Sequence, residues 1–554
     1  MDYDSINNSM SKQQKLSLSA AATRQMADNN PQTYDEINSY MTNQQKLSMI
    51  AADLQQLVDG DPQDYSEINN TMSHQQKLSL IAAALNDLKD KPSGEESLAI
   101  GEYDPATGKI TGSGFGDTGT VYVLDRMQNK GVPAQVSNWS GSEITLTTPI
   151  DTANLVGVTS LWVETPAGES NKVMVHGEQP VPGYGIVYYD DASGVVHTHA
   201  VTTLAEYNTL VSGTTTTGPY KQWTFDGNTV NADQIVGFQI GEAATTTPQY
   251  FLAEMPRLNQ PIDFSGLASI SDYVMRSDVS FDQPVDITGV AIGSNFLYNC
   301  HKFNQPIAVE TAASFGMSFL SECSAFNHPV KLPDAMTIVP ALFLQNCENF
   351  NSPVDLNNAT VVGSNFMQNC YVFNLLIDTS KLTSVGNYFF DSCRNFNQPI
   401  DTSSIETIGS NFMSNCRAFN QQLDLGEVTT VGSNMFSSST DFSQPISLPK
   451  CTSIGSYFLY RATSFKARVT LGAATTVGGY FMNGVPSANT IDVGTSTPPT
   501  GDYSFCPQRA SNANKYFSAI TQGFTLIGAN AAVWKEALPD KTSYPARTII
   551  DGTA

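Results

Sequence analysis

The feature that most constrains this chain is an internal repeat with a period of about 23 residues. Each copy begins at one large apolar residue, and the copies follow one another at a regular spacing: Leu258, Phe281, Phe303, Phe326, Phe350, Phe373, Phe396, Phe419, Phe442 and Phe465. Units this short cannot bury their apolar side alone, so neighbouring units stack into a solenoid with one continuous core. The repeat therefore predicts a long surface suited to binding, with no enclosed catalytic pocket.

Cysteine recurs at one position of the repeat. Six cysteines share it, and the next two copies carry Ser439 and Ala462 there: Cys300, Cys323, Cys347, Cys370, Cys393 and Cys416. Such a replacement set is typical of a tight buried slot for a small side chain. We therefore expect reduced core thiols here, not a disulfide framework or a metal site.

Glycine and asparagine also keep fixed positions. The glycines are expected to adopt a backbone conformation that other residues resist: Gly316, Gly363, Gly386, Gly409, Gly432, Gly455 and Gly478. The asparagines, one residue after the aromatic position, are expected to satisfy backbone groups inside a turn: Asn304, Asn327, Asn351, Asn374, Asn397 and Asn420.

An acidic row is the first candidate binding face. Six aspartates share a repeat position, interrupted by Ala308 and Lys331: Asp263, Asp286, Asp355, Asp378, Asp401 and Asp424. Stacking would place these like charges about 5 Å apart, which is unfavourable unless solvent or cations screen them. Two interpretations remain open, a solvated face and a face that binds Ca²⁺ or a cationic partner.

The motifs of this repeat resemble a known family. Residues 303–308 read Phe-Asn-Gln-Pro-Ile-Ala and 396–401 read Phe-Asn-Gln-Pro-Ile-Asp, while 363–367 and 409–413 both read Gly-Ser-Asn-Phe-Met. They resemble the BspA-like leucine-rich repeat, and the resemblance extends over all the copies named above, from Leu258 onward. Proteins of this kind are mostly surface-exposed adhesins with varied targets, so the resemblance implies a fold and a binding role but no ligand.

A second, longer repeat opens the chain. Its three copies begin at Tyr3, Tyr34 and Tyr65, and each contains a Gln-Gln-Lys-Leu block that starts at Gln13, Gln44 or Gln75. Capping-box spacing and apolar periodicity predict paired α-helices in each copy, over residues 1–91. The copies form either a self-sufficient bundle or a docking module that contacts equivalent sites on a symmetric assembly, with these tyrosines and glutamines as candidate contacts.

Residues 97–179 change to short alternating runs, which predict a β-sandwich. Residues 110–116, the pair Trp139-Ser140, Pro149 and residues 165–171 resemble an IPT/TIG immunoglobulin-like domain. That family implies a spacer or adhesive module without catalytic residues. We expect a small mixed β adaptor at 180–250, the solenoid at 251–484 and a C-terminal cap at 485–554, so the fold class is multidomain.

Composition excludes several partners. The chain has 554 residues and a net charge of −24, which argues against nucleic acid and anionic membrane surfaces. It starts without a basic and apolar leader and has no apolar run long enough to span a membrane, so we expect synthesis in the cytoplasm and no membrane insertion.

His197 and His199 form a His-x-His pair, and on a strand both rings would point to one face. Three chains around a threefold axis could share a metal there, although an isolated histidine pair is more often simply a pair of polar side chains facing solvent. The sequence contains no nucleophile elbow, phosphate-binding loop or paired catalytic carboxylates. We therefore expect no enzyme and no cofactor.

These features together predict a bacteriophage virion protein made in the host cytoplasm: a head decoration, head fibre or tail-associated adhesin. Residues 1–90 would dock on the major capsid or tail protein, and the solenoid would contact a host surface glycan or protein. A bacterial cell-surface adhesin exported without a classical signal peptide is the alternative. An enzyme acting on surface polysaccharide is the weakest candidate, and self-association into a homo-oligomer remains open.

Overall fold

The computed structural model describes residues 50, 97–210, 221–472, 476–482, 484–485, 490–494, 525–533 and 550–552. The chain divides into two compact units, 1–97 and 98–554. Of the predicted helical repeats only Ile50, a buried helical residue, is described. The docking candidates Tyr3, Gln13, Tyr34, Gln44, Tyr65 and Gln75 lie outside the described residues.

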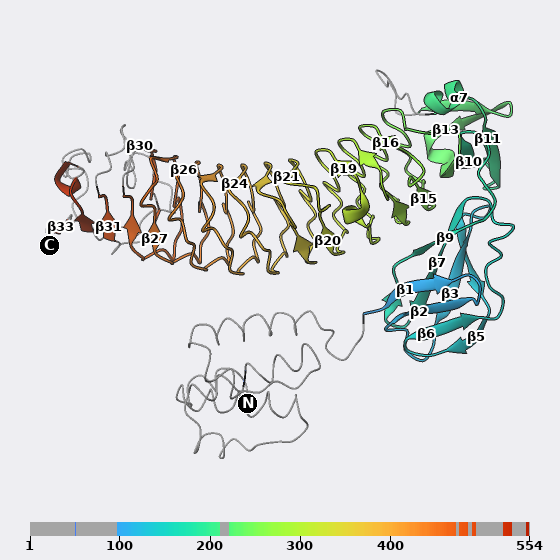
Figure 1. Cartoon of the computed structure of the whole chain (residues 1–554), viewed down its shortest axis with the longest axis horizontal. Helices are drawn as coiled ribbons and strands as arrows, with labels where there is room; N and C mark the ends of the chain where they lie inside the picture. The colour runs from blue at the N-terminus through green and yellow to red at the C-terminus, as the bar shows by residue number, and fades with distance from the viewer. Residues whose placement is uncertain are drawn as a thin grey trace, which may run out of the picture. The chain divides into compact units, whose positions relative to one another are not determined.

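Two antiparallel sheets share one core between residues 98 and 176 (Figure 1). The first contains β1 (Ala99–Asp104), β2 (Lys109–Ser113), β6 (Glu143–Leu146) and β5 (Val136–Trp139), in that order. The second contains β4 (Lys130–Ala134), β3 (Thr120–Asp125), β7 (Val158–Thr165), β8 (Gly168–Glu169) and β9 (Val173–His176). Their inward side chains, such as Ile110, Phe115 and Val163, are fully buried. The relation of these residues to IPT/TIG domains remains a prediction.

A small β sheet leads into the solenoid. It has the order β11 (Val196–Val201), β10 (Gly185–Asp190) and β14 (Ile235–Ile240). Beside it lie α7 (Leu204–Thr209), the hairpin of β12 (Gln222–Phe225) and β13 (Asn228–Asn231), and the 3-10 turn η1 (Ala232–Gln234). Phe238 and Tyr207 pack on Phe251 of the first coil, with ring centroids 5.2 and 5.1 Å apart. This adaptor therefore covers the apolar end of the solenoid and shares its core.

The solenoid consists of stacked coils joined by parallel β ladders (Figure 1). One flank of the described part carries β16 (Ser269–Ile270), β18 (Ala291–Ile292) and β19 (Ser314–Phe315), then β21 (Ile338–Val339), β23 (Val361–Val362), β24 (Ser384–Val385), β25 (Thr407–Ile408), β26 (Thr430–Val431), β28 (Ser453–Ile454) and β30 (Thr476–Val477). The register advances by one repeat per coil from Val339 to Val477. The predicted solenoid is confirmed.

The other flank has shorter ladders and the 3-10 turn η2 (Val309–Thr311). Its strands are β15 (Ile262–Asp263) with β17 (Val285–Asp286), β20 (Val330–Lys331) with β22 (Val354–Asp355), and β27 (Ile446–Ser447), β29 (Val469–Thr470), β31 (Thr490–Asp492), β32 (Thr525–Ile527) and β33 (Ile550–Gly552). The ladder thus continues past residue 484, where a cap was expected. The interval between Thr490 and Thr525 is longer than one repeat, and it hides this continuation from a search for the regular period.

A column of phenylalanines sets the distance between coils. From Phe281 to Phe465 each ring stacks on the ring one coil later, with centroids 5.7–6.0 Å apart and planes within 1–21°. Every ring in this column is at most 1% exposed. Burial of one such side chain contributes about 2–3 kcal/mol, so the column stabilises the stack along its whole length.

The cysteine column adds hydrogen bonds inside the core. Each thiol donates to a carbonyl of the preceding coil, as Cys370 Sγ does to Leu344 O at 3.2 Å. Ser439 Oγ donates to Met413 O in the same way. All six cysteines are free and fully buried, so the predicted tight slot is confirmed. Burial raises the pKa of these thiols well above their usual value, and they are poor metal ligands and nucleophiles for that reason.

The asparagine column also satisfies backbone groups, as predicted. Each asparagine Oδ1 accepts the backbone N–H of the next residue in the column at 2.7–2.9 Å, from Asn304 through Asn420 to Ser443. These side chains bridge neighbouring coils at the same point from Asn304 to Ser443. They supply hydrogen bonds where the ladder strands have ended.

The glycines of the repeat do not adopt the unusual backbone conformation that we expected from the sequence. Gly363, Gly386 and Gly409 do not have positive φ, whereas non-glycine residues just after them, such as Asn365 and Asn411, do. A Cβ on any of the three glycines would approach the backbone of the preceding coil to 2.4–2.7 Å. Glycine is required here by the close approach of two coils, not by a left-handed conformation.

The two-sheet domain is attached to the adaptor and to the first coils through buried glutamines. Gln239 Oε1 accepts the N–H of Val158 at 2.7 Å, Gln283 Oε1 accepts the Ser160 hydroxyl at 2.8 Å, and Gln305 Oε1 accepts the N–H of Lys172 at 2.7 Å. The three glutamines are at most 3% exposed. Buried amides need partners, so these bonds hold the domain and the solenoid in one orientation.

An ion pair reinforces the same contact. Lys172 Nζ lies 2.8 Å from Asp282 Oδ2 and 3.0 Å from Glu169 Oε1, and it also donates to the carbonyl oxygen of Asp282. Its side chain is 8% exposed and lies over the Trp162 ring. Removing one partner from a buried ion pair leaves the other charge uncompensated.

We predict that Lys172→Met lowers the free energy of unfolding by about 2 kcal/mol, because the partly buried Asp282 would lose its charged hydrogen-bond donor. Lys109→Met, in an exposed pair with Glu143, should cost less than about 1 kcal/mol. Chemical denaturation of the full chain measures both values, and hydrogen exchange should rise in β7 and β17 of the Lys172 variant. Equal effects of the two substitutions would contradict the buried contact.

Candidate functional site

The acidic row forms a series of turns. In six coils the aspartate Oδ1 accepts the backbone N–H two residues later at 2.8–3.0 Å: Asp263, Asp286, Asp355, Asp378, Asp401 and Asp424. Asp492 makes the same bond to Gly494. Aspartate is favoured at this position because its short side chain closes such a turn. The row therefore has a local structural role that neither of our two interpretations included.

The aspartates remain accessible at the surface. Hydrogen bonds from Ser380 hold the pKa of Asp378 below its usual value, so this carboxylate stays charged. Within the described ranges, no group of three or more His, Cys, Asp or Glu side chains is arranged to hold a metal ion. Asp263 approaches His176 of β9, with Oδ2 3.4 Å from Nδ1. Whether the row binds a cationic partner remains a prediction.

On the described part of the flank that carries the acidic row, hydrogen bonds between two neighbouring coils are missing at one point. Thr379 Oγ1 donates to Asp401 O at 2.6 Å and Thr402 Oγ1 donates to Asp424 O at 2.5 Å, and these hydroxyls bridge successive coils. The next residue in that column is Leu425, which has no hydroxyl. Among the described residues no hydrogen bond joins Leu425 to Ser447. The regular ladder resumes only with Ile446 N and Arg468 O, 3.0 Å apart.

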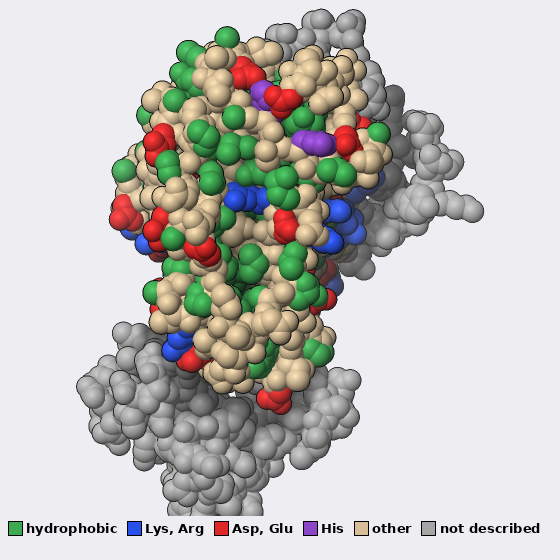
Figure 2. Space-filling model, turned by 90° about the vertical axis from the view of Figure 1, so that its right-hand side faces the viewer, with side chains coloured by type: hydrophobic (Ala, Val, Ile, Leu, Met, Phe, Trp, Pro, Cys, Tyr) green, Lys and Arg blue, Asp and Glu red, His purple; other side chains and the backbone are tan. Residues whose placement is uncertain are grey.

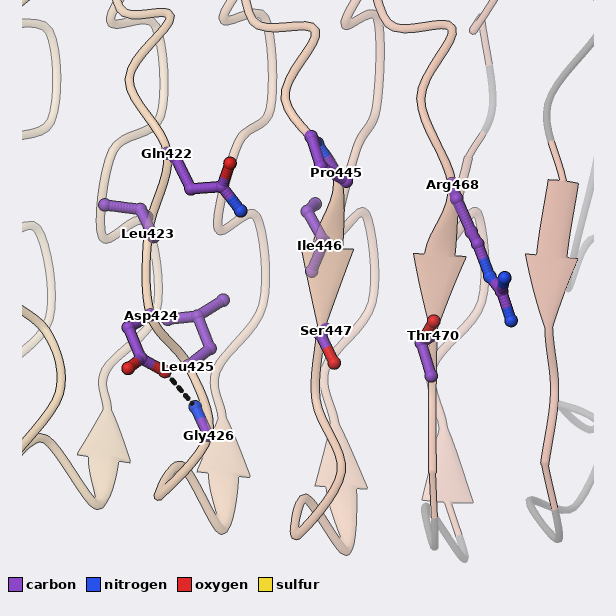
Figure 3. Close-up of a pocket in the computed structure, with 10 residues that line it drawn as sticks. All are labelled: Gln422, Leu423, Asp424, Leu425, Gly426, Pro445, Ile446, Ser447, Arg468 and Thr470. Carbon is purple, nitrogen blue, oxygen red and sulfur yellow. Dashed lines mark hydrogen bonds between the residues drawn. The ribbon is translucent and has the colours of Figure 1, made fainter. Parts of the chain in front are cut away.

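A hollow of about 380 Å³ lies at this point (Figure 3). Leu423, Leu425 and Ile446, all buried, are part of its lining. The remaining lining residues are Gln422, Asp424, Gly426, Pro445, Ser447, Arg468 and Thr470. The hollow thus combines an apolar base with hydroxyl, amide, carboxylate and guanidinium groups, a combination typical of binding sites.

The two charged side chains that line the hollow each have a partner nearby. Arg468 Nη2 lies 2.5 Å from Asp492 Oδ2 of β31, and Asp424 is oriented by its bond from Gly426 N. Of the predicted row only Asp424 reaches the hollow; the other five aspartates lie on other coils. The sequence signal that could have located the site is the change from Thr379 and Thr402 to Leu425, together with Gln422 in place of the usual proline.

The two candidate metal ligands lie on β11 of the adaptor. His197 Nε2 lies 2.9 Å from Asp191 Oδ2, while His199 lies 2.7 Å from Glu206 Oε1 through Nε2 and 3.0 Å from Asp226 Oδ2 through Nδ1. Figure 2 shows histidine side chains beside acidic ones on this face. Both nitrogens of His199 are therefore engaged by carboxylates. The side chain of His199 joins β11 to α7 and to the β12–β13 turn.

We predict that His199 stabilises the adaptor most strongly at acidic pH. Burial favours the neutral ring, but hydrogen bonds and charges from Glu206 and Asp226 outweigh it and raise the pKa of His199 above 6.5. A raised pKa means that the charged ring stabilises the folded protein. This stabilisation is complete at pH values below the pKa of histidine in the unfolded chain, and it is lost as the pH rises through the pKa of His199 in the folded protein. The melting temperature should fall across that range.

His199→Asn should remove this part of the pH dependence, while His301→Asn, at an exposed position, should leave it intact. Calorimetry at a series of pH values measures the effect, and NMR titration gives the pKa of His199 directly. A pKa of His199 at or below 6.5 would contradict the prediction.

Comparisons with known proteins identify the repeats. A family model described as BspA type leucine rich repeat region matches residues 268–397 and 360–483. No curated protein matches the chain. A leucine rich cell surface protein from Faecalibacterium prausnitzii A2-165 is 10% identical, with 53% of this chain and 95% of that chain covered and a TM-score of 0.30. A leucine-rich repeat protein from Bacteroides ovatus ATCC 8483 is 12% identical, with 66% and 98% covered and a TM-score of 0.34. Residues 268–483 are thus a BspA-type leucine-rich-repeat region.

Proposed function

We propose that this protein is a non-enzymatic adhesin. It binds a surface glycan or protein through the flank of its leucine-rich-repeat region that carries the acidic row. The observation that supports this function most directly is the hollow at residues 422–470, which is open to solvent and lined by both polar and apolar groups. Ligand recognition of this kind needs hydrogen-bonding groups placed around an apolar contact. No step of chemistry is required of these residues.

Rigidity of the coils supports the same function. Phenylalanine, cysteine and asparagine columns fix each coil to its neighbours, so residues on the flank keep their spacing before a ligand arrives. A surface that is already ordered loses little conformational entropy on binding. The buried contacts of Gln283, Gln305 and Lys172 extend this rigidity to the two-sheet domain, which we propose acts as a fixed support for the solenoid.

We further propose that residues 1–91 attach the protein to a symmetric assembly. Three copies of one repeat, starting at Tyr3, Tyr34 and Tyr65, suit three equivalent contacts. The setting that we favour is the surface of a bacteriophage particle, with the major capsid or tail protein as the partner. A bacterial cell surface is the alternative. In the described part of the chain no helix is long and apolar enough to cross a membrane.

Filling the hollow should weaken binding. We predict that Ser447→Trp reduces the affinity of the full chain for its target about tenfold or more, because the indole would occupy the space between Asp424 and Thr470. Ala308→Trp places the same side chain at the same coil position, away from the hollow, and should leave affinity unchanged. Binding to bacterial cells and to purified surface polysaccharides is the measurement. If the two variants bind equally, the hollow is not the site.

Removing the N-terminal repeats tests the attachment. We predict that a chain lacking residues 1–91 is absent from purified particles but still binds target cells, because the solenoid keeps its own core. Mass spectrometry of particles and cell-binding assays measure the two properties separately. Incorporation of the truncated chain at the normal level would contradict the docking role. Recovery of the full chain in cell envelopes, and not in particles, would support the alternative setting.

A further inference from the structure

Two arginines occupy one coil position in neighbouring coils. Ala418 N donates to Arg394 O at 3.1 Å and Asn395 N donates to Tyr371 O at 3.2 Å, so Tyr371, Arg394 and Arg417 succeed one another along the stack. The phenylalanines of the same coils, Phe373, Phe396 and Phe419, are 5.7 and 6.0 Å apart. The two guanidinium groups therefore extend from points separated by one coil spacing.

These two arginines lack carboxylate partners among the described residues. Lys450 pairs with Glu427 and Arg468 pairs with Asp492, whereas Arg394 and Arg417 form no such ion pair with any residue that the structure describes. Arg394 instead lies over the Tyr371 ring, 4.3 Å from its centroid, and Arg417 Nε donates to Asn415 Oδ1 at 3.0 Å. Both arginines are exposed. Two adjacent positive charges that form no ion pair repel each other, and they are unexpected in a chain with a net charge of −24.

The side chains are nevertheless held in place. Stacking on Tyr371 restricts Arg394, while Asn415, which restricts Arg417, is itself fixed by Ser392 Oγ at 3.1 Å and by the carbonyl of Ser437 at 2.7 Å. The Nη atoms of both guanidinium groups have no partner in the described part of the chain. Arginine binds oxyanions through such paired N–H groups. Arg394 and Arg417 offer such N–H groups from neighbouring coils.

We propose that Arg394 and Arg417 bind the carboxylate of an acidic sugar in an otherwise neutral saccharide. This inference rests on the proposed function, in which the solenoid contacts surface glycans, and it names the ligand class. Glu348 lies in the coil before Tyr371, and Asp441 N donates to Arg417 O, so acidic side chains flank the site at both ends. They would repel a polyanion such as nucleic acid or a heavily sulfated chain.

Neutral groups beside the arginines suit the uncharged part of such a saccharide. Asn395 follows Arg394, is exposed and makes no side-chain hydrogen bond to a described residue, so its amide is free to pair with a sugar hydroxyl. Val372 is 38% exposed and follows Tyr371. An apolar contact beside amide donors is a common arrangement for a sugar ring. These neighbours favour a saccharide over an acidic peptide.

The test uses the full chain and defined probes. Calorimetry or saturation-transfer NMR compares sialyllactose, a glucuronic acid trisaccharide, lactose, a sulfated lactose and a neutral peptide with one glutamate. We expect binding of the two carboxylated sugars that weakens with salt, and none of lactose. Preference for the sulfated sugar, equal binding of lactose, or preference for the peptide would each overturn the proposal.

Substitutions locate the site. Arg394→Gln and Arg417→Gln should each weaken binding of the carboxylated sugars about tenfold, since each removes charge-assisted hydrogen bonds to the carboxylate. Arg394→Lys should recover part of the affinity, because it keeps the charge but not the paired N–H groups. Lys450→Gln, which removes a paired cation, should have no effect. Unchanged binding by the double variant Arg394→Gln, Arg417→Gln would overturn the proposal.

The outcome also separates this inference from the function on which it rests. If the double variant still binds bacterial cells and Ser447→Trp does not, the adhesin function stands and the arginine site is wrong. If the wild-type chain binds neither cells nor any saccharide or peptide probe, both are wrong. Circular dichroism verifies that each variant remains folded, as expected for substitutions of exposed side chains.

Discussion

The distance between coils is the constraint on which the rest of this structure depends. Phenylalanine rings stacked 5.7–6.0 Å apart run the length of the repeats, and the cysteine and asparagine columns make their hydrogen bonds at that same spacing. Glycine is needed at Gly386 and Gly409 because the coils come so close there that a Cβ would strike the preceding backbone. A chain with this core offers its ligands a surface whose geometry is already fixed.

Much of the solenoid could be predicted from the sequence. Residues at one position of the repeat share the same environment, so the set of residue types found there indicates what that environment is. The slot that holds Cys347 and Cys370 also accepts Ser439 and Ala462, which is enough to show that it is small and buried. The role of Asn374 in closing the joint between coils follows from the same repetition. By contrast, the glycine position allows two explanations, a left-handed turn or a close approach, and only the structure distinguishes them.

Contacts made by departures from the repeat could not be predicted in the same way. Gln305 and Gln398 occupy the same coil position, yet Gln305 accepts the N–H of Lys172 from the two-sheet domain and Gln398 donates to Asn374 O of the preceding coil. Nothing in either sequence segment indicates which partner is present. The hollow beside Leu425 arises similarly, since the loss of one threonine hydroxyl matters only where the neighbouring ladder bonds are also missing.

Function in such a protein should therefore lie where the repeat is broken on its outer side. Inward positions are constrained by both neighbouring coils, so substitutions there cost packing and hydrogen bonds. Outward positions face solvent and can vary more freely, except where the side chain closes a turn, as those of Asp378 and Asp401 do. A residue that differs from the repeat pattern and also destabilises the unbound protein is a stronger indication of function, because stability does not explain its presence. Arg394 and Arg417 meet that condition as adjacent like charges, whereas Lys450 with Glu427 does not. This difference is the reason to assign a ligand to the first pair.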